Sequence, residues 1–384
     1  MLEYRKGRPE DAEAIIDLAN LVFSHAHCPH DFPTLLPKLF SAENFVPEYH
    51  YIAVDDGRIR ACIGSYPNEQ VICGRRLRSR DIGTVSVHPY ARREGHMRKL
   101  MAMVQDDITA EKADLSWLGG QRQRYGYWGY ERVGVRTVFS VSRTNARHVL
   151  PGREPVWELR ELGRDDSALL EAKALHDRQA AHFVRANFYD VLRNWKNIPF
   201  GFFDADGRLC GYAVTNADGT DVTELVLAEG ADVHEAILAL LSRSERFVIS
   251  VSPWQEDLAR VLYNICEDYR IESNEQCRVN CFENVLNAAF ALRSLMSDAA
   301  LIPDTVFEVS IPETNEQLRI MWAGGRGEAS AVDALSKDAL VLTRKEAETL
   351  FFAPVSLIQK RTGIPAGAAF LFPVPLTVPS PDAV

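Results

Sequence analysis

Several features that would indicate a membrane or secreted protein are missing from this sequence of 384 residues. No uninterrupted apolar stretch of about 18 residues occurs, so we expect no membrane-spanning helix. The opening residues, MLEYRKGRPEDAEAI, do not combine a basic region with an apolar run, so we expect no signal peptide. The seven cysteines are odd in number and have no repeated spacing, which argues against a disulfide framework and favours the reducing cytoplasm.

Positive charge is also scarce. The chain has 43 lysines and arginines against 53 aspartates and glutamates, a formal net charge of −10, which argues against a general nucleic-acid-binding role. Charged residues make up 25% of the chain and hydrophobic residues 46%, which is typical of a globular protein. The length predicts two or three domains.

An internal repeat organises the first two thirds of the chain. A short strand, a Gly-Arg-Pro-Glu-Asp turn and a helix are followed by YIAVDDGRIRACIGSY, a hairpin pattern around Asp56-Gly57. The same order returns in WELRELGRDDSALLEAKAL and in FGFFDADGRLCGYAV, a hairpin pattern around Asp206-Gly207. This ordered agreement predicts a duplicated α+β unit, with ARHVLPGREP as the linker.

The pattern changes after about Gln276. CFENVLNAAFALRSLM predicts an amphipathic helix, FEVSI, QLRIMW and ALVLT predict strands, and KEAETLFF predicts a short helix. A third, smaller α+β domain fits this order. We therefore expect three domains, over residues 1–147, 148–275 and 276–384.

The stretch VSVHPYARREGHMRKLM changes from a strand pattern to a helix pattern. Residues 83–87 alternate like a half-buried strand, Pro89 ends ladder pairing, and apolar residues then recur at helical spacing from Met97. Arg92-Arg93-Glu94-Gly95-His96 thus lies at a helix N-terminus, where free N–H groups and the helix dipole favour an anion. Gly95 allows close approach of a ligand, and the two arginines can bond phosphate oxygens. The order of these features favours a pyrophosphate site over an ordinary connection with solvated arginines.

The second copy has TELVLAEGADVHEAILALL at the matching place, a strand and a helix without the paired arginines. We therefore expect one copy to bind the ligand and the other to keep only the architecture.

The segment VSVHPYARREGHM resembles the acyl-CoA loop of the GNAT superfamily of N-acetyltransferases, and DLSWL and YGYWGYERVG follow in that family's order. The two halves and the third domain resemble the Eis-like (enhanced intracellular survival) acetyltransferases, whose second half is a degenerate GNAT domain and whose third domain is sterol-carrier-like. The resemblance implies an α+β protein with two tandem GNAT-like domains and a small sterol-carrier-like domain. It also implies acetyl-CoA as the acetyl donor, a cytoplasmic location and a homo-oligomer, such as a hexameric ring.

The resemblance also implies roles for residues of the loop. The backbones of Val85, Ser86 and Val87 would pair with the pantetheine arm like an added strand. The pyrophosphate would be bound by the N–H groups of a second set, namely Arg92, Arg93, Glu94, Gly95, His96 and Met97. Many GNAT loops have a small residue where Met97 stands.

The expected general acid is a tyrosine, since a phenol can donate a proton to a departing thiolate. Tyr125 lies four residues before Gly129, at the position that matches the family's general acid. Tyr127 and Tyr130 are alternatives, and strand alternation would put Tyr127 on the same side as Tyr125. All three could instead pack around Trp128.

For the base, the resemblance implies the chain's own C-terminal carboxylate, here that of Val384. The apolar tail FLFPVPLTVPSPDAV is compatible with insertion into the protein. Family members commonly end in an aromatic residue, whereas this chain ends Asp382-Ala383-Val384. A frayed terminus is therefore the alternative.

The segment SHAHCPHDF places His25, His27, Cys28 and His30, all possible zinc ligands, close together. Their spacing is not that of a recognised finger, so we expect no metal. The resemblance implies that this segment is the loop after the first helix, which borders the acceptor pocket in the family. The acceptor expected from the resemblance is an amine on a small molecule or a peptide: an aminoglycoside, a polyamine, a lysine or an N-terminus. The alternative function is a non-catalytic binding module whose third domain holds a lipid-like ligand or a partner.

Overall fold

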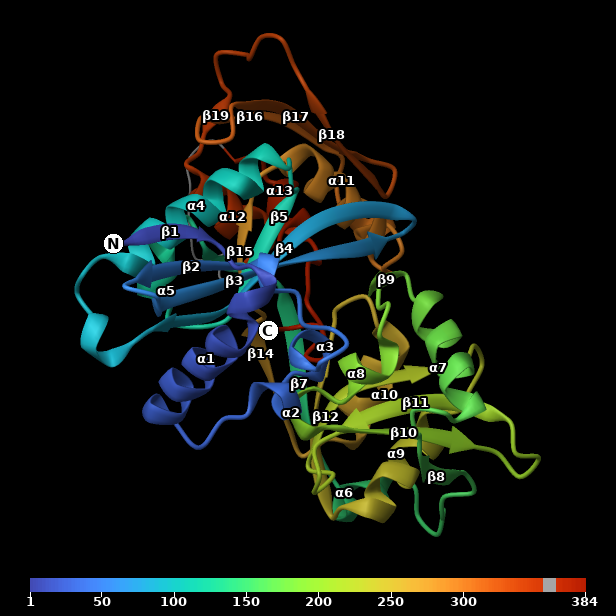
Figure 1. The fold of residues 1–384 in the computed structure, drawn as a ribbon. Coiled ribbons are helices and arrows are strands. Elements are labelled where there is room, and N and C mark those ends of the chain that lie inside the picture. The colour runs from blue at the N-terminus through green and yellow to red at the C-terminus, as the bar shows by residue number, and fades with distance from the viewer. Residues whose placement is uncertain (355–363) are drawn as a thin grey trace.

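The computed structural model describes residues 1–354 and 364–384, and Figure 1 shows their arrangement. They form an eight-stranded, a seven-stranded and a four-stranded sheet, with helices packed against them. No helix in the described residues has the length and apolar composition needed to cross a membrane.

The first sheet contains the strand that leads to the expected ligand loop. Its strand order is β1-β2-β3-β4-β5-β15-β6, with β9 paired to β3. The β2–β3 turn has positive φ at Asp56 (46°) and Gly57 (75°), the two-residue turn that the DG pair predicts. The elements of this part are β1 (Glu3–Lys6), α1 (Ala12–Ala26), α2 (Phe32–Leu35), α3 (Pro37–Phe40), β2 (His50–Asp55), β3 (Arg58–Ile72), β4 (Arg75–Val87), α4 (His96–Ala110), β5 (Leu115–Leu118), α5 (Arg122–Gly126) and β6 (Glu131–Arg132).

The second sheet repeats this plan. Its order is β14-β7-β13-β12-β11-β10-β8, so β8 and β10–β13 correspond to β1–β5. The last pair of each set, β4–β5 and β12–β13, is parallel, and a helix connects each pair. This agreement confirms the duplicated α+β unit. Its elements are α6 (Arg143–Val149), β8 (Glu158–Glu161), α7 (Ser167–Asp177), β9 (Ala181–Phe183), α8 (Phe188–Leu192), η4 (Asn194–Lys196), β10 (Ile198–Phe203), β11 (Leu209–Thr215), β12 (Asp221–Leu227), α9 (Val233–Arg243), β13 (Arg246–Val251), α10 (Glu256–Ile265) and β14 (Asp268–Ser273).

Two strands cross between the expected parts of the chain. β7 (Val135–Ser142) lies within residues 1–147 but pairs with β13 and β14 in the second sheet. β15 (Gln276–Val279) lies within residues 276–384 but pairs with β5 and β6 in the first sheet. The division into residues 1–147, 148–275 and 276–384 therefore stays a proposal about organisation, in which neighbouring parts exchange strands.

The last part of the chain packs on the first sheet. Its strands are β16 (Thr305–Ile311), β17 (Glu316–Ala323), β18 (Arg326–Ala331) and β19 (Leu340–Val341), and its helices are α11 (Phe282–Arg293), α12 (Arg344–Phe352) and α13 (Ala368–Leu371). Trp117 of β5 belongs to the same buried cluster as Phe282 and Trp322, so this core is continuous with the first sheet. Beyond α13 the chain runs back to the middle of the molecule, where Figure 1 shows the C-terminus beside α3.

Candidate active site

The site opens where two parallel strands separate. The pairing of β4 with β5 ends at Ile82 and Leu118, whereas β4 continues along β3 as far as Val87. Between these points β4 has a bulge at Thr84, whose φ of 48° is a genuine outlier for a β-branched residue. Such strain persists only where the surrounding structure holds it, and it commonly marks functional sites. The bulge turns β4 away from β5 and leaves one edge of residues 83–87 without a neighbouring strand in the described sheet.

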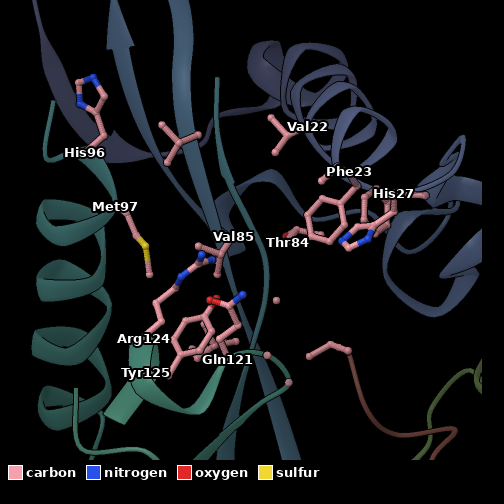
Figure 2. Close-up of a pocket in the computed structure, with 18 of the residues that line it drawn as sticks. Val22, Phe23, His27, Thr84, Val85, His96, Met97, Gln121, Arg124 and Tyr125 are labelled. Atoms are coloured by element: carbon pink, nitrogen blue, oxygen red, sulfur yellow. The ribbon is translucent and has the colours of Figure 1, made fainter. Parts of the chain in front are cut away.

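A cavity of ≈ 1030 Å³ lies at this separation. Figure 2 shows Met97, Arg124 and Tyr125 on one wall, Phe23 and His27 on the other, with Val85 between them. Most of the expected site residues line it, namely Val85, Val87, Arg92, Arg93, Gly95, His96, Met97, Tyr125 and Val384. Two expected residues do not belong to this lining: Ser86 is fully buried, and the Glu94 carboxylate bonds the His96 ring (Nε2···Oε2 3.0 Å).

One end of the cavity has features that suit an anion. Gly95 caps α4 with a φ of 83° and offers no side chain to the first N–H groups of the helix, which have no partner within it. Arg93, two residues before it, also has a positive φ, of 73°. Three arginines of the loop and of α4 line the cavity, namely Arg92, Arg93 and Arg98, and Arg124 lines it beside Tyr125. Backbone N–H groups and guanidinium groups together suit a pyrophosphate.

The equivalent helix of the second copy has no such opening. Asp232 caps α9, accepting a hydrogen bond from the backbone N–H of His234 (2.9 Å), and it also pairs with Arg153. A carboxylate of the protein thus occupies the place where an external anion would bind. The two copies differ at the position where the sequence predicted a difference.

The three candidate tyrosines lie in different environments. Tyr125 lines the cavity and is 6% exposed, and burial raises the pKa of its phenol, although the Arg124 guanidinium opposes the shift. Tyr127 is 77% exposed and packs edge-on against Trp128. Tyr130 is buried and bonded to the Ser116 hydroxyl (2.8 Å). Of the three, only Tyr125 lines the cavity.

The expected strand through these tyrosines is wrong. Residues 122–126 form the short helix α5, and Tyr127 is its C-cap, so strand alternation does not relate Tyr125 to Tyr127. Gly120, with a φ of 134°, precedes this helix, and a Cβ there would lie 2.7 Å from the Tyr125 ring. Only glycine allows the backbone to pass this close to the ring.

The C-terminal tail, residues 379–384, is fixed inside the protein. The Lys38 ammonium donates to the carbonyl oxygens of Pro381 (2.9 Å), Asp382 (2.6 Å) and Ala383 (2.9 Å). Burial lowers the pKa of Lys38 to about 8. Three successive carbonyls bound to one ammonium hold the backbone up to the penultimate residue, so the terminus is not frayed.

The second copy fixes the same tail from the other side. Arg185, 2% exposed, donates to both carboxylate oxygens of Asp382 (2.9 and 2.7 Å) and to Glu224 (2.8 Å). Burial alone would raise the pKa of Glu224, but Arg185 outweighs it and lowers that pKa to about 2. The Asn194 amide donates to the Pro381 carbonyl (2.8 Å). Removing one member of such a buried ion pair typically costs about 3–5 kcal/mol, so these contacts strongly restrict the tail.

The tail ends beside the tyrosine. A Cβ on Gly119 would lie 3.6 Å from the Glu275 carboxyl and 3.9 Å from an oxygen of the Val384 carboxylate, while the next glycine, Gly120, contacts Tyr125. The terminal carboxylate and the phenol therefore flank one short turn. On its other side, Val384 lies so close to Gly83 that a Cβ there would be 3.2 Å from the Val384 Cβ.

Sequence reasoning missed Lys38, Arg185, Asn194 and Trp195 as site residues. Lys38 lies 345 positions from the farthest carbonyl that it binds, and Arg185 lies 197 positions from Asp382. No local motif signals such partners. The one available signal was the acidic residue near an otherwise apolar C-terminus.

The histidine segment borders the cavity at the end of α1. His27 lines it, and the His30 Nδ1 lies 2.6 Å from the Cys28 carbonyl oxygen. Among residues 1–354 and 364–384, no three His, Cys, Asp or Glu side chains converge in a way that could hold a metal ion.

Comparison with known proteins agrees with this geometry. Residues 3–134 match the family described as acetyltransferase (GNAT) domain. A search of curated proteins gave no significant match.

Three solved structures share the fold over nearly the whole chain. A probable N-acyltransferase from Enterococcus faecalis is 16% identical with a TM-score of 0.69, covering 99% of this chain and 98% of that one. A GCN5-related N-acetyltransferase from Kribbella flavida is 19% identical with a TM-score of 0.64, covering 91% and 88%. Eis1 from Mycobacterium abscessus is 14% identical with a TM-score of 0.64, covering 98% and 97%. Residues 3–134 are therefore a GNAT acetyltransferase domain, and the chain as a whole has the fold of an Eis-like GNAT protein.

Proposed function

We propose that this protein transfers the acetyl group of acetyl-CoA to a primary amine, with Tyr125 as the general acid and the Val384 carboxylate as the base. GNAT acetyltransferases use acetyl-CoA as their acetyl donor, and the family match supports acetyl transfer in general. The observation that carries the finer proposal is the turn at Gly119–Gly120, which is flanked by the carboxylate on one side and the phenol on the other.

The proposed reaction is a direct displacement. The amine nitrogen attacks the thioester carbonyl carbon, the C–S bond breaks, and the Tyr125 phenol gives its proton to the departing thiolate. The proton lost by the attacking nitrogen passes to the Val384 carboxylate and then to solvent, and the Tyr125 phenolate takes up a proton from solvent before the next turnover. Because burial raises the pKa of Tyr125, the phenol stays protonated at neutral pH, as a general acid must.

The donor fits the cavity as follows. The pantetheine arm would lie along the free edge formed by Val85, Ser86 and Val87, adding a strand where β5 has separated from β4. The pyrophosphate would bind the N–H groups from Arg92 to Met97 at the start of α4. In this position the thioester would lie at the separation of the two strands, next to Tyr125.

Three wider properties belong to the same proposal. The last part of the chain would be a sterol-carrier-like domain, copies of the chain would assemble into a homo-oligomer such as a hexamer, and the protein would act in the cytoplasm. They rest on the resemblance to Eis-like proteins. Light scattering of the purified protein tests the assembly, and a single-chain mass would contradict it.

The first experiment measures acetyl-CoA binding by calorimetry and CoA release with an amine panel, using a thiol reagent. We expect micromolar binding that requires the pantetheine arm and amine-dependent release. No binding would refute the proposal.

The matched variants for the acid are Tyr125→Phe and Tyr127→Phe. Tyr125→Phe should lower kcat by about 10²-fold, at the lower end of what general acid–base catalysis contributes, and leave acetyl-CoA affinity unchanged. Tyr127→Phe should change neither, because Tyr127 is exposed outside the cavity. Equal kcat values for the two variants would remove Tyr125 from the mechanism.

A further inference from the structure

The acceptor end of the cavity, opposite the arginines, is formed by apolar and aromatic side chains. They come from the end of α1, from α2 and α3, and from the η4 turn, and the principal ones are Phe23, Phe32, Leu36, Leu39, Phe40 and Trp195. The Phe23 and Phe32 rings meet edge to face, with centroids 5.1 Å apart. Such a surface favours a flat apolar or aromatic group.

The charges of the cavity point the same way. Among the described residues that line it, none is aspartate or glutamate, so the one formal negative charge is the terminal carboxylate of Val384. The arginine end carries the guanidinium groups of Arg92, Arg93 and Arg98, and Arg124 adds a fourth beside Tyr125. The further ammonium groups of a bound polycation would lie either at the apolar end without a partner or at the other end, where the arginines repel them. Burying an unpaired charge costs free energy. The nearest other carboxyl, that of Glu275, would lie 3.6 Å from a Cβ on Gly119, and burial raises its pKa and so favours its neutral form. One ammonium beside the Val384 carboxylate is therefore what this cavity best neutralises.

Trp195 provides a third, independent observation. It comes from the second copy, where Trp195 (φ 57°) and Lys196 (φ 61°) are consecutive non-glycine residues in the left-handed region. The indole lines the cavity, remains 43% exposed and meets the His30 ring edge-on, with centroids 6.4 Å apart. Asn194, the preceding residue, is bonded to Pro381 of the tail. Strained backbone that holds a half-exposed indole over a cavity indicates a role in binding.

We infer that the acceptor is a monoamine whose amino group is carried by an aromatic or apolar body, such as an arylalkylamine, and not a polyamine or an aminoglycoside. This inference rests on the proposed acetyl transfer. The amino group would lie beside the Val384 carboxylate, and the aromatic body would lie between α1, α2 and the Trp195 indole.

The test compares kcat/KM for tryptamine, 2-phenylethylamine, spermidine and kanamycin at saturating acetyl-CoA. We expect kcat/KM to be at least about 100-fold higher for the two arylalkylamines than for the two polycations. The reason is that burying one ammonium group without a partner costs more free energy than one ion pair recovers. The same amines are titrated into protein saturated with CoA, which measures acceptor binding without turnover.

Two variants and a control make the test specific. Trp195→Ala should raise the KM for tryptamine about tenfold and leave the KM for acetyl-CoA unchanged. Phe23→Glu, at a half-buried position, should raise kcat/KM for spermidine relative to kcat/KM for tryptamine, because it supplies a carboxylate. Phe370 is an exposed aromatic residue on α13 outside the cavity lining, so Phe370→Ala should change neither the KM for tryptamine nor the ratio of kcat/KM for spermidine and tryptamine.

Each outcome decides between the two proposals. A kcat/KM for spermidine or kanamycin equal to or higher than that for the arylalkylamines would overturn the proposed acceptor class. An unchanged KM for tryptamine in Trp195→Ala would overturn it as well. Acetyl-CoA binding with neither turnover nor binding of the arylalkylamines would also overturn it. Absence of acetyl-CoA binding would instead refute the proposed function.

Discussion

Lengthening the chain by one glycine after Val384 tests whether the terminal carboxylate is the base. The contacts of Lys38 with residues 381–383 and of Arg185 with Asp382 hold the tail in place. The added residue would therefore replace the carboxylate by a neutral amide and move the charge by up to about 3.5 Å. The fold, the arginine end and Tyr125 would be unaffected.

The size of the effect follows from the protonation of the acceptor. A primary alkylamine has a pKa of about 10.4, so at pH 7 only about one molecule in 10³ is neutral. A base that removes the ammonium proton of the acceptor within the complex can raise the rate by up to about 10³-fold, in line with the 10²–10⁴-fold typical of general base catalysis. We therefore expect kcat at pH 7 to fall by about 10²–10³-fold. The deficit should shrink about tenfold per pH unit up to the pKa of the amine, since solution then supplies the neutral form.

The assay is CoA release against pH, with calorimetry of acetyl-CoA for each variant. Val384→Ala keeps both the carboxylate and the chain length, so it should lose much less activity than the extended chain. Full activity of the extended chain, or an equal deficit at pH 7 and pH 9, would refute the base assignment. A parallel loss of acetyl-CoA affinity would show instead that the extension disrupts the donor site.

Two further predictions concern the donor loop and the buried charges. Arg93→Glu should weaken acetyl-CoA binding by about 10–100-fold, which is the contribution of one or two charge-assisted hydrogen bonds. Its circular dichroism spectrum should be unchanged. An unaltered affinity in calorimetry would remove the pyrophosphate assignment. Asp81 is 4% exposed, and burial raises its pKa to about 7 from the ordinary 3.8, so the folded protein binds the proton more tightly than the unfolded chain. The resulting stability is present below pH 3.8 and is lost as the pH rises through about 7. The melting temperature of Asp81→Asn should therefore be close to that of the wild type at pH 5 and above it at pH 8. A difference in melting temperature that does not change with pH would contradict this.

Much of the fold and of the donor loop follows from the sequence. The DG pair fixes the β2–β3 turn because its left-handed dihedral angles suit few other residues. Pro89 and Gly95 likewise mark the end of β4 and the start of α4, and the apolar spacing after them describes one buried helix face. These are local properties, expressed within a few residues, so they can be read without tertiary contacts.

The aromatic segment around Tyr125 shows where local reading stops. Alternating tyrosines and glycines fit a strand, but residues 122–126 form a helix whose tyrosine packs on Gly120. So short a segment carries no periodicity strong enough to decide, and its conformation depends on the separation of β4 from β5.

The rest was decided by tertiary structure alone. The sequence by itself determined the duplicated unit and the strand–helix junction with its arginines and glycine, because turn geometry, helix ends and periodic burial are local. Which strands the copies exchange, which tyrosine faces the cavity and where the chain ends depend on contacts between residues hundreds of positions apart. Lys38 and Arg185 hold the tail only because folding brings α3 and the second copy to either side of it, where buried charges need partners.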